Sequence, residues 1–323
     1  MAGIKGDVGL LRTTVDAYRD NLRRLKSWQA RIELTRLTRK SVLPRESRAT
    51  IDFSYDRSRD STTWHWSPDE SAPNPGPPGS PLDPITGVRS KELGGSAHIG
   101  LIPRRSESEP RVAQVFPEGQ LKPGLGAEEF DPLLFFTNQQ EIGAMLDHYI
   151  EVADGARVNH TSVRRERDVV ILDVDTPKRL TRFEFDLTKS GNLTFFLSDA
   201  KDTQGRLGEW RCEYAHIAGV WVPDKVTRHR LNRGTREEMD ITYRWLENKV
   251  NVPVAAEAFS LERLGARPGD IVADNRAGVE FTYGDVGPEA RNHQALWFIA
   301  ANTAIIVVLA LLSWWSRRRR VRA

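Results

Sequence analysis

The first stretch of the chain has apolar residues at a helical period. Leu11, Val15, Tyr18, Leu22 and Leu25 follow one another at intervals of four, three, four and three residues, which places them on one side of a helix. The other side carries acids and arginines together, whereas helices that lie along a membrane have a basic polar face. We therefore expect this helix to pack on a sheet.

The period then changes to two and stays there for most of the chain. The segment "WQARIELT" places Trp28, Ala30, Ile32 and Leu34 on one face and charged residues between them, as in a half-buried strand. The same alternation marks "ATIDFSYD", "TTWHWS", "DVVILDVD", "TRFEFDL", "LTFFLSD", "EWRCEY", "GVWVPDKVTRHRL", "EEMDITYRWLE" and a closing strand near Phe281. An apolar inner face and a charged outer face are typical of antiparallel sheets. The turn "TKSGN" predicts one of the hairpins.

A second helical pattern lies in "FDPLLFFTNQQEIGAMLDHYIEVADGA". Thr137 or Asn138 can cap its start, and Gly155 follows its end. Its apolar side consists of Ile142, Met145, Leu146 and Tyr149. Since a sheet with one aromatic face has to cover that face, we expect both helices to lie on it.

Residues 67–126 differ in composition from the rest, because they hold 11 of the 18 prolines. Proline donates no hydrogen bond to a sheet and interrupts helices. We expect a long surface loop here, whose short apolar pieces "AHIGLIP" and "RVAQVF" touch the body. The body itself, residues 1–286, is predicted to be one domain of the mainly β class, with a curved antiparallel sheet and helices.

The C-terminal region predicts a membrane anchor. Residues 295–315 contain no charged side chain, and at the helical rise they span about 30 Å, the thickness of a bilayer's hydrocarbon core. The residues expected to fix this helix at the two membrane surfaces are Trp297, Phe298, Trp314, Trp315, Arg317, Arg318, Arg319 and Arg320. Residues 287–294 are then a linker, and residues 316–323 are a basic tail.

The net charge of +3 depends on this tail, because the last eight residues carry five arginines and no acid, which leaves −2 for the rest. A nucleic-acid partner is therefore not expected. The positive-inside rule places the tail in the cytoplasm and residues 1–286 outside it. The first residues contain no apolar export signal. Either the chain begins downstream of its true start, which we favour, or it is a tail-anchored protein whose body is cytoplasmic.

The order of elements over residues 7–284 resembles the LolA/LolB/RseB superfamily of lipoprotein-carrier-like domains. The resemblance rests on "LRRLKSWQARIEL", "GVWVPDKV" and "NVPVAAEAFSLERLGARPGDIVADNRAGVEFTY". It implies a strongly curved, incomplete antiparallel barrel with helices on its concave face and an apolar cavity. The chain is similar to membrane-anchored bacterial variants such as those of planctomycetes. The proline-rich insertion and the anchor depart from soluble carriers, and a tethered domain cannot shuttle between membranes.

Sequence motifs for catalysis are lacking: the chain contains no nucleophile elbow, zinc-protease motif or phosphate-binding loop. His65, between two tryptophans, is expected on the charged surface without a metal. Alternation places Asp173 and Asp175 on the same outward face, where solvation explains them. We expect no catalytic residue, no cofactor and no metal.

Two hypotheses for function remain open. In the first, the concave face binds an acyl chain, a lipoprotein segment or an apolar partner peptide, although aromatic residues at period two also form ordinary cores. The candidate lining residues are Phe183, Phe185, Leu193, Phe195, Trp210, Tyr214, Tyr243 and Trp245. In the second, the core is filled and the loop of residues 67–126 binds an envelope protein. A tail processed as a sorting signal is a further alternative, although no recognition motif precedes the span.

Overall fold

A computed structural model describes residues 5–39, 45–69, 85–90, 95–99, 109–117, 146–147, 160–201, 205–231, 238–260 and 262–284. Its strands are β1 (Lys5–Gly6), β2 (Ser27–Arg39), β3 (Arg45–Asp56), β4 (Ser61–Pro68), β5 (Ile85–Ser90), β6 (Gly95–Ile99), β7 (Val112–Pro117), β8 (His160–Glu166), β9 (Val169–Asp175), β10 (Arg179–Asp186), β11 (Asn192–Ala200), β12 (Gly205–Ile217), β13 (Val220–Leu231), β14 (Glu238–Val250), β15 (Ile271–Asp274) and β16 (Val279–Thr282). The helices are α1 (Val8–Arg24) and three short 3₁₀ turns, η2 (Leu187–Lys189), η3 (Ala256–Phe259) and η4 (Glu262–Leu264).

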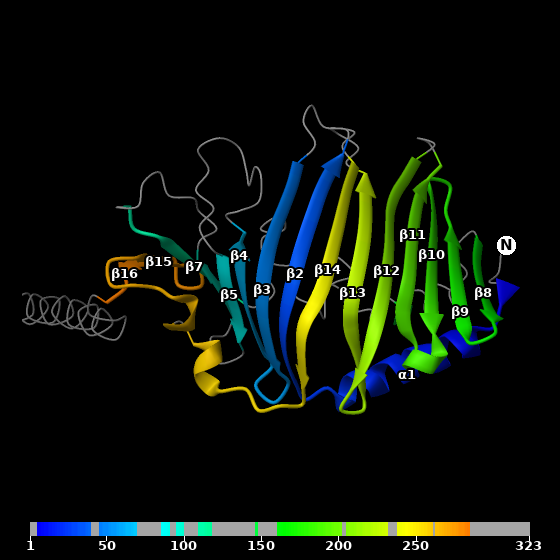
Figure 1. Cartoon of the computed structure of the whole chain (residues 1–323), viewed down its shortest axis with the longest axis horizontal. Coiled ribbons are helices and arrows are strands. Elements are labelled where there is room, and N and C mark those ends of the chain that lie inside the picture. The colour runs from blue at the N-terminus through cyan, green and yellow to red at the C-terminus, as the bar shows by residue number, and fades with distance from the viewer. Residues whose placement is uncertain are drawn as a thin grey trace, which may run out of the picture.

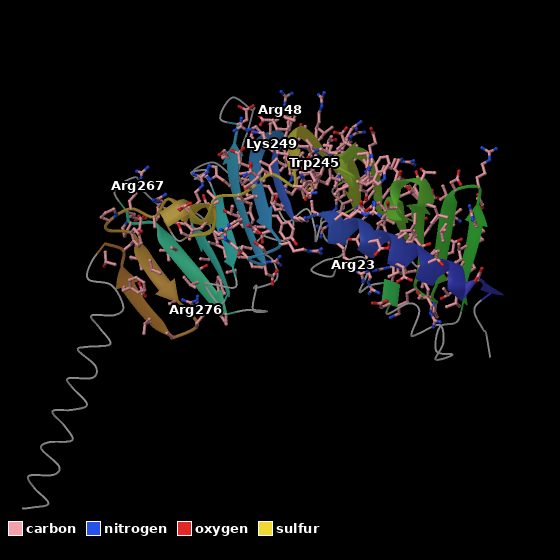
Figure 2. All side chains as sticks on the ribbon, turned by 90° about the horizontal axis from the view of Figure 1, so that it is seen from below. Arg23, Arg48, Trp245, Lys249, Arg267 and Arg276 are labelled. Carbon is pink, nitrogen blue, oxygen red and sulfur yellow. The ribbon has the colours of Figure 1, made fainter. Side chains whose placement is uncertain are left out.

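These strands form one open sheet in the order β1-β8-β9-β10-β11-β12-β13-β14-β2-β3-β4-β5-β6-β7-β15-β16. All neighbours are antiparallel except β1 with β8 and β7 with β15. The pairing of β14 with β2 joins the C-terminal half of the described chain to its N-terminal half (Figure 1). Viewed along its strands, the sheet is an arch (Figure 2). The predicted mainly β class with a curved, open sheet is confirmed.

Helix α1 lies on the concave side of the arch, at the end formed by β8 to β13 (Figure 2). Asp7 caps its start by accepting a hydrogen bond from the Leu10 amide at 3.1 Å. Leu11, Val15 and Tyr18 are buried against the sheet, as their spacing predicts. Near its end, Asn21 exchanges two hydrogen bonds with the backbone of Trp221, at 2.9 and 2.8 Å, which fixes the helix to β13.

Two apolar clusters cover the concave face. The first, the α1 cluster, is packed between the helix and the sheet and consists of Leu11, Val15, Tyr18, Leu146, Val163, Val170, Leu172, Val174, Phe183, Phe185 and Leu193. The second, the central cluster, lies on β12, β13, β14, β2, β3 and β4 and includes Trp28, Ile32, Ile51, Phe53, Trp64, Trp210, Ile241, Tyr243 and Trp245. The alternation of the sequence therefore predicts the apolar face correctly on most strands.

Beyond β4, the segment that packs on the sheet lies on the opposite, convex face. There η3 and η4 pack on β4, β5 and β6, and Figure 2 shows this segment on the outer side of the arch. The resulting convex cluster consists of Val88, Ala97, Ile99, Ala113, Val115, Val254, Phe259, Leu264 and Val272. Helical segments therefore cover parts of both faces, whereas the sequence led us to expect them on the concave face alone.

The prediction of a loop at 67–126 is wrong for the described residues of this segment. Strands β5, β6 and β7 continue the sheet, and Ala97, Ile99, Ala113 and Val115 are buried. Within these three strands the only proline is Pro117, the last residue of β7, so the ladder loses little from the missing donor. Pro68 is likewise the last residue of β4, and the other prolines of the segment lie outside the described strands.

Of the predicted second helix, the structure describes Leu146 and Asp147, which are helical. Leu146 is fully buried in the α1 cluster, and the Asp147 carboxylate forms an ion pair with Arg19 of α1. This part of the chain therefore lies against α1 on the concave side. The rest of the predicted helix is outside the described residues.

No described helix is long and apolar enough to cross a membrane. The predicted linker 287–294, the span 295–315 and the tail 316–323, with all the anchor residues named above, lie outside the described residues. They remain a prediction from the sequence.

Candidate functional site

Three of the predicted lining residues lie beneath α1. Phe183, Phe185 and Leu193 are 2, 0 and 1 % exposed and belong to the α1 cluster. The rings of Phe183 and Phe185 stack with their centroids 6.3 Å apart. Side chains of the helix occupy the space above them, so this end of the concave face is a filled core.

Phe195 lies on the convex face, against the prediction. In the pairing of β10 with β11, Phe185 is opposite Leu193 but Glu184 is opposite Phe195, so Thr194 is an extra residue in a β-bulge. The bulge reverses the alternation after Leu193, and Phe196 takes the concave position. Phe195 instead lies under the Arg211 guanidinium, 4.8 Å from its ring centre.

Trp210 and Tyr214, both on β12, are at the junction of the two concave clusters. The ring of Trp210 is 5.7 Å from that of Phe196 and lies under the Arg228 guanidinium at 4.5 Å. Tyr214 packs at the edge of the central cluster. Its hydroxyl group donates a hydrogen bond to the carbonyl of Leu193 at 2.8 Å, and burial raises its pKa. Tyr214 thus has a structural tie to β11.

Tyr243 and Trp245 bring β14 into the central cluster, where they are 1 and 6 % exposed. The indole of Trp245 stacks on that of Trp28, and the Trp28 ring meets Phe53 edge-on at 5.4 Å. The Trp28 indole N–H donates to the side-chain oxygen of Asn248 at 2.8 Å. Trp28 and Phe53 are therefore members of this aromatic surface that the predicted set omits, although their alternation signals the correct face.

The central cluster extends well beyond the helix. The main contacts of α1 are with β8, β9 and β13 (Figure 1), whereas the aromatic surface continues across β14, β2, β3 and β4. At one end of this surface Ile241 is flanked in register by Arg36 on β2 and Arg228 on β13.

Two titratable groups on the concave side, Cys212 and His98, are held neutral by burial. Burial raises the pKa of the Cys212 thiol. His98 on β6 is 2 % exposed, between the rings of Trp64 and Phe116, and burial lowers its pKa to about 4. Among the described residues, no group of three His, Cys, Asp or Glu side chains is arranged to hold a metal.

The predicted outward acids behave as surface ion pairs. Partial burial raises the pKa of Asp173, but hydrogen bonds from Arg182, at 2.7 Å, and from Arg164 outweigh it and hold the pKa below its usual range. Asp175 pairs with Lys201. These contacts account for the positions of both carboxylates on the outer face.

No family model and no curated protein matches the chain. Among solved structures, a DUF1329 family protein from Desulfovibrio piger matches with a TM-score of 0.41 and 11 % identity over 79 % of this chain and 98 % of its own. A putative outer membrane lipoprotein-sorting protein domain from Vibrio parahaemolyticus matches with a TM-score of 0.41 and 8 % identity, over 79 % and 99 %. A LolA superfamily protein from Nitrosomonas europaea matches with a TM-score of 0.39 and 9 % identity, over 78 % and 98 %.

Proposed function

We propose that this chain is a non-enzymatic domain that binds an apolar ligand on the concave face of its curved sheet. The ligand is an acyl chain, or the apolar part of a lipoprotein or partner peptide. The observation that carries the proposal is the central cluster, whose aromatic surface runs over six strands while α1 covers the other end of the face.

The chemistry of this surface favours an apolar ligand over a reaction. Burial of apolar area contributes about 25 cal/mol per Å² and requires no charge. Trp28, Tyr243 and Trp245 supply large, rigid rings that are 1, 1 and 6 % exposed, so a ligand gains their area only by displacing what covers them. Arg36 and Arg228 lie at one end of the surface, where the acidic group of a fatty acid or anionic lipid would be stabilised.

The location of the domain is proposed from the sequence. The uncharged residues 295–315 and the arginines after them support a single-pass anchor in a bacterial cell envelope, with residues 1–286 outside the cytoplasm. A tether of this kind holds the concave face near the lipid bilayer. Its role is then to present or sense a ligand at the membrane, and not to carry it between membranes.

One observation favours the alternative, an interaction protein with a filled core. Phe183, Phe185, Tyr243 and Trp245 are all nearly inaccessible, as in an ordinary core. In that case a partner binds the proline-rich segment 67–126, whose described parts are β5, β6 and β7 together with short flanking stretches.

Binding of a fluorescent fatty acid separates the two functions. The full chain in lipid nanodiscs is titrated with the probe, and empty nanodiscs of the same lipid measure partitioning into the bilayer. The proposal expects saturable binding above that of the empty discs. Equal signals from nanodiscs with and without the protein would contradict the proposal and favour the filled-core alternative.

A further inference from the structure

A cavity of about 540 Å³ with both polar and apolar lining groups lies on the convex face, opposite the aromatic surface. Its floor is formed by β3, β4 and β5, and its roof by the segment that contains η3 and η4. The lining residues are Asp52, Ser54, Thr63, His65, Thr86, Arg111, Ala258, Arg263, Leu264, Gly265 and Arg267. A second cavity of about 490 Å³ adjoins it, with Asp52, Ser54, Ala258 and Arg263 in common.

The roof is held by contacts that need no ligand. At its start, the Arg59 guanidinium donates to the carbonyl of Val254 at 3.0 Å. In its middle, Phe259 and Leu264 are buried in the convex cluster. At its end, the Arg111 guanidinium bonds the Gly265 carbonyl and the Asp270 carboxylate, the latter at 2.7 Å. The cavity is therefore a preformed feature of the fold.

The charges around the cavity do not cancel. Asp52 is paired with Arg31 at 2.8 Å, and Arg111 is paired with Asp270. Arg263 and Arg267 are exposed, and in the described part of the chain neither guanidinium has a carboxylate partner. Glu257 lines only the second cavity. Among the side chains that the structure describes, the mouth of the first cavity thus has two positive charges without a carboxylate partner.

The floor supplies neutral hydrogen-bonding groups. The Nδ1 atom of His65 is 2.7 Å from the Thr86 hydroxyl oxygen, and the Thr63 hydroxyl donates to the Gly87 carbonyl at 3.1 Å. Burial lowers the pKa of His65, the Asp52 carboxylate raises it and Arg263 lowers it further, with a net decrease. The imidazole is therefore neutral near pH 7, and its Nε2 atom and the Ser54 hydroxyl are available to a ligand.

We propose that this cavity binds an oxyanion, the phosphate or carboxylate group of a polar molecule, between Arg263 and Arg267 at the mouth and His65 and Ser54 on the floor. Two guanidinium groups beside hydroxyl groups are the donor set that such anions prefer. The site lies on the other face from the aromatic surface, and the inference does not rest on the function proposed above. The anion is the headgroup of a lipid or a free solute.

Inorganic phosphate and lipid vesicles test the two sources separately. The full chain in zwitterionic nanodiscs is titrated with phosphate, and its association with vesicles of phosphatidylglycerol is compared with phosphatidylcholine vesicles. We expect R263Q/R267Q to weaken the binding of phosphate, of phosphatidylglycerol, or of both, by about tenfold. R23Q is the matched control, because Arg23 is an exposed arginine on α1, far from Arg267 (Figure 2), and it should bind like the parent.

The His65 imidazole gives an independent readout. A bound anion favours the protonated ring, so the NMR titration of ¹⁵N-labelled His65 should shift to higher pH when phosphate is present. This shift should be absent in R263Q/R267Q. The proposal is overturned if neither anion binds, if the double variant binds as the parent does, or if R23Q loses the same affinity.

Discussion

The indole rings of Trp28 and Trp245 stack across β2 and β14, with centroids 6.4 Å apart and planes inclined by 5°. These strands belong to opposite ends of the described sequence, so the stack closes the junction between the two halves of the sheet. It also forms the middle of the aromatic surface proposed to receive a ligand.

Loss of the Trp245 ring should destabilise the fold strongly. Trp245→Ala removes the stack and leaves a cavity in the central cluster, which costs about 3–5 kcal/mol in the free energy of unfolding. Its neighbour Leu246 is 51 % exposed, so Leu246→Ala is the control and should change stability by less than about 0.5 kcal/mol. Urea denaturation of both variants measures the difference. Equal losses would show that Trp245 is not buried as described.

The β-bulge at Thr194 predicts unequal effects for two phenylalanines close in sequence. Phe185 is fully buried beneath α1, whereas Phe195 is on the convex surface. Phe185→Ala should cost about 3–5 kcal/mol, and Phe195→Ala about 1 kcal/mol or less, since it loses mainly the contact with Arg211. Thermal unfolding of the two variants checks this. A larger loss for Phe195→Ala would mean that the strand continues without a bulge.

The buried face of a strand was predictable where polar and apolar residues alternate without interruption. The segments "WQARIELT" and "TRFEFDL" show the pattern because one face is buried and the other is ionic. The same reasoning gave the wrong face for Phe195. Thr194 is an extra residue in the strand, so the side chains after it point to the opposite faces, and nothing in the amino-acid composition of the strand signals this change. This reasoning also missed β6, whose small residues Gly95 and Ala97 carry little apolar signal.

The packing of helical segments on both faces of the sheet could not be predicted from the local pattern of apolar and polar residues. The cavity beside Arg263 exists because a segment near the end of the described chain crosses strands from its beginning. Such a contact depends on long-range packing and leaves no period in the sequence. His65 was correctly predicted on the charged face, but the roof above it was not foreseen.

Burial of His98 makes stability depend on pH. Its pKa is lowered to about 4 in the folded chain, against about 6.5 when unfolded. Between these values the unfolded state binds the extra proton, so stability falls as the pH decreases from about 6.5 to about 4, by up to ~3 kcal/mol. His98→Phe keeps a ring between Trp64 and Phe116 and should lose this dependence. Urea denaturation at several pH values compares the two proteins. Parallel pH curves would contradict the burial of the imidazole.

The Asp270 carboxylate should stabilise the roof only above acidic pH. Partial burial raises its pKa, but hydrogen bonds from Arg111 and from the amide of Arg267 outweigh this and lower it. A lowered folded pKa gives stability that is present above the unfolded value of about 3.9 and is lost as the pH falls through the folded value. Asp270→Asn should therefore be less stable at pH 7, with the difference shrinking below about pH 4. A difference that stays constant would show that the charge of Asp270 is not responsible.

The central claim is tested most directly by photo-crosslinking a diazirine-bearing fatty acid to the full chain in native membranes and mapping the labelled peptides by mass spectrometry. The account predicts adducts within β14, β2 and β3, near Trp28 and Trp245, that excess unlabelled fatty acid abolishes. Adducts confined to residues 295–315, or to peptides from β15 and β16, would contradict an apolar ligand on the concave face.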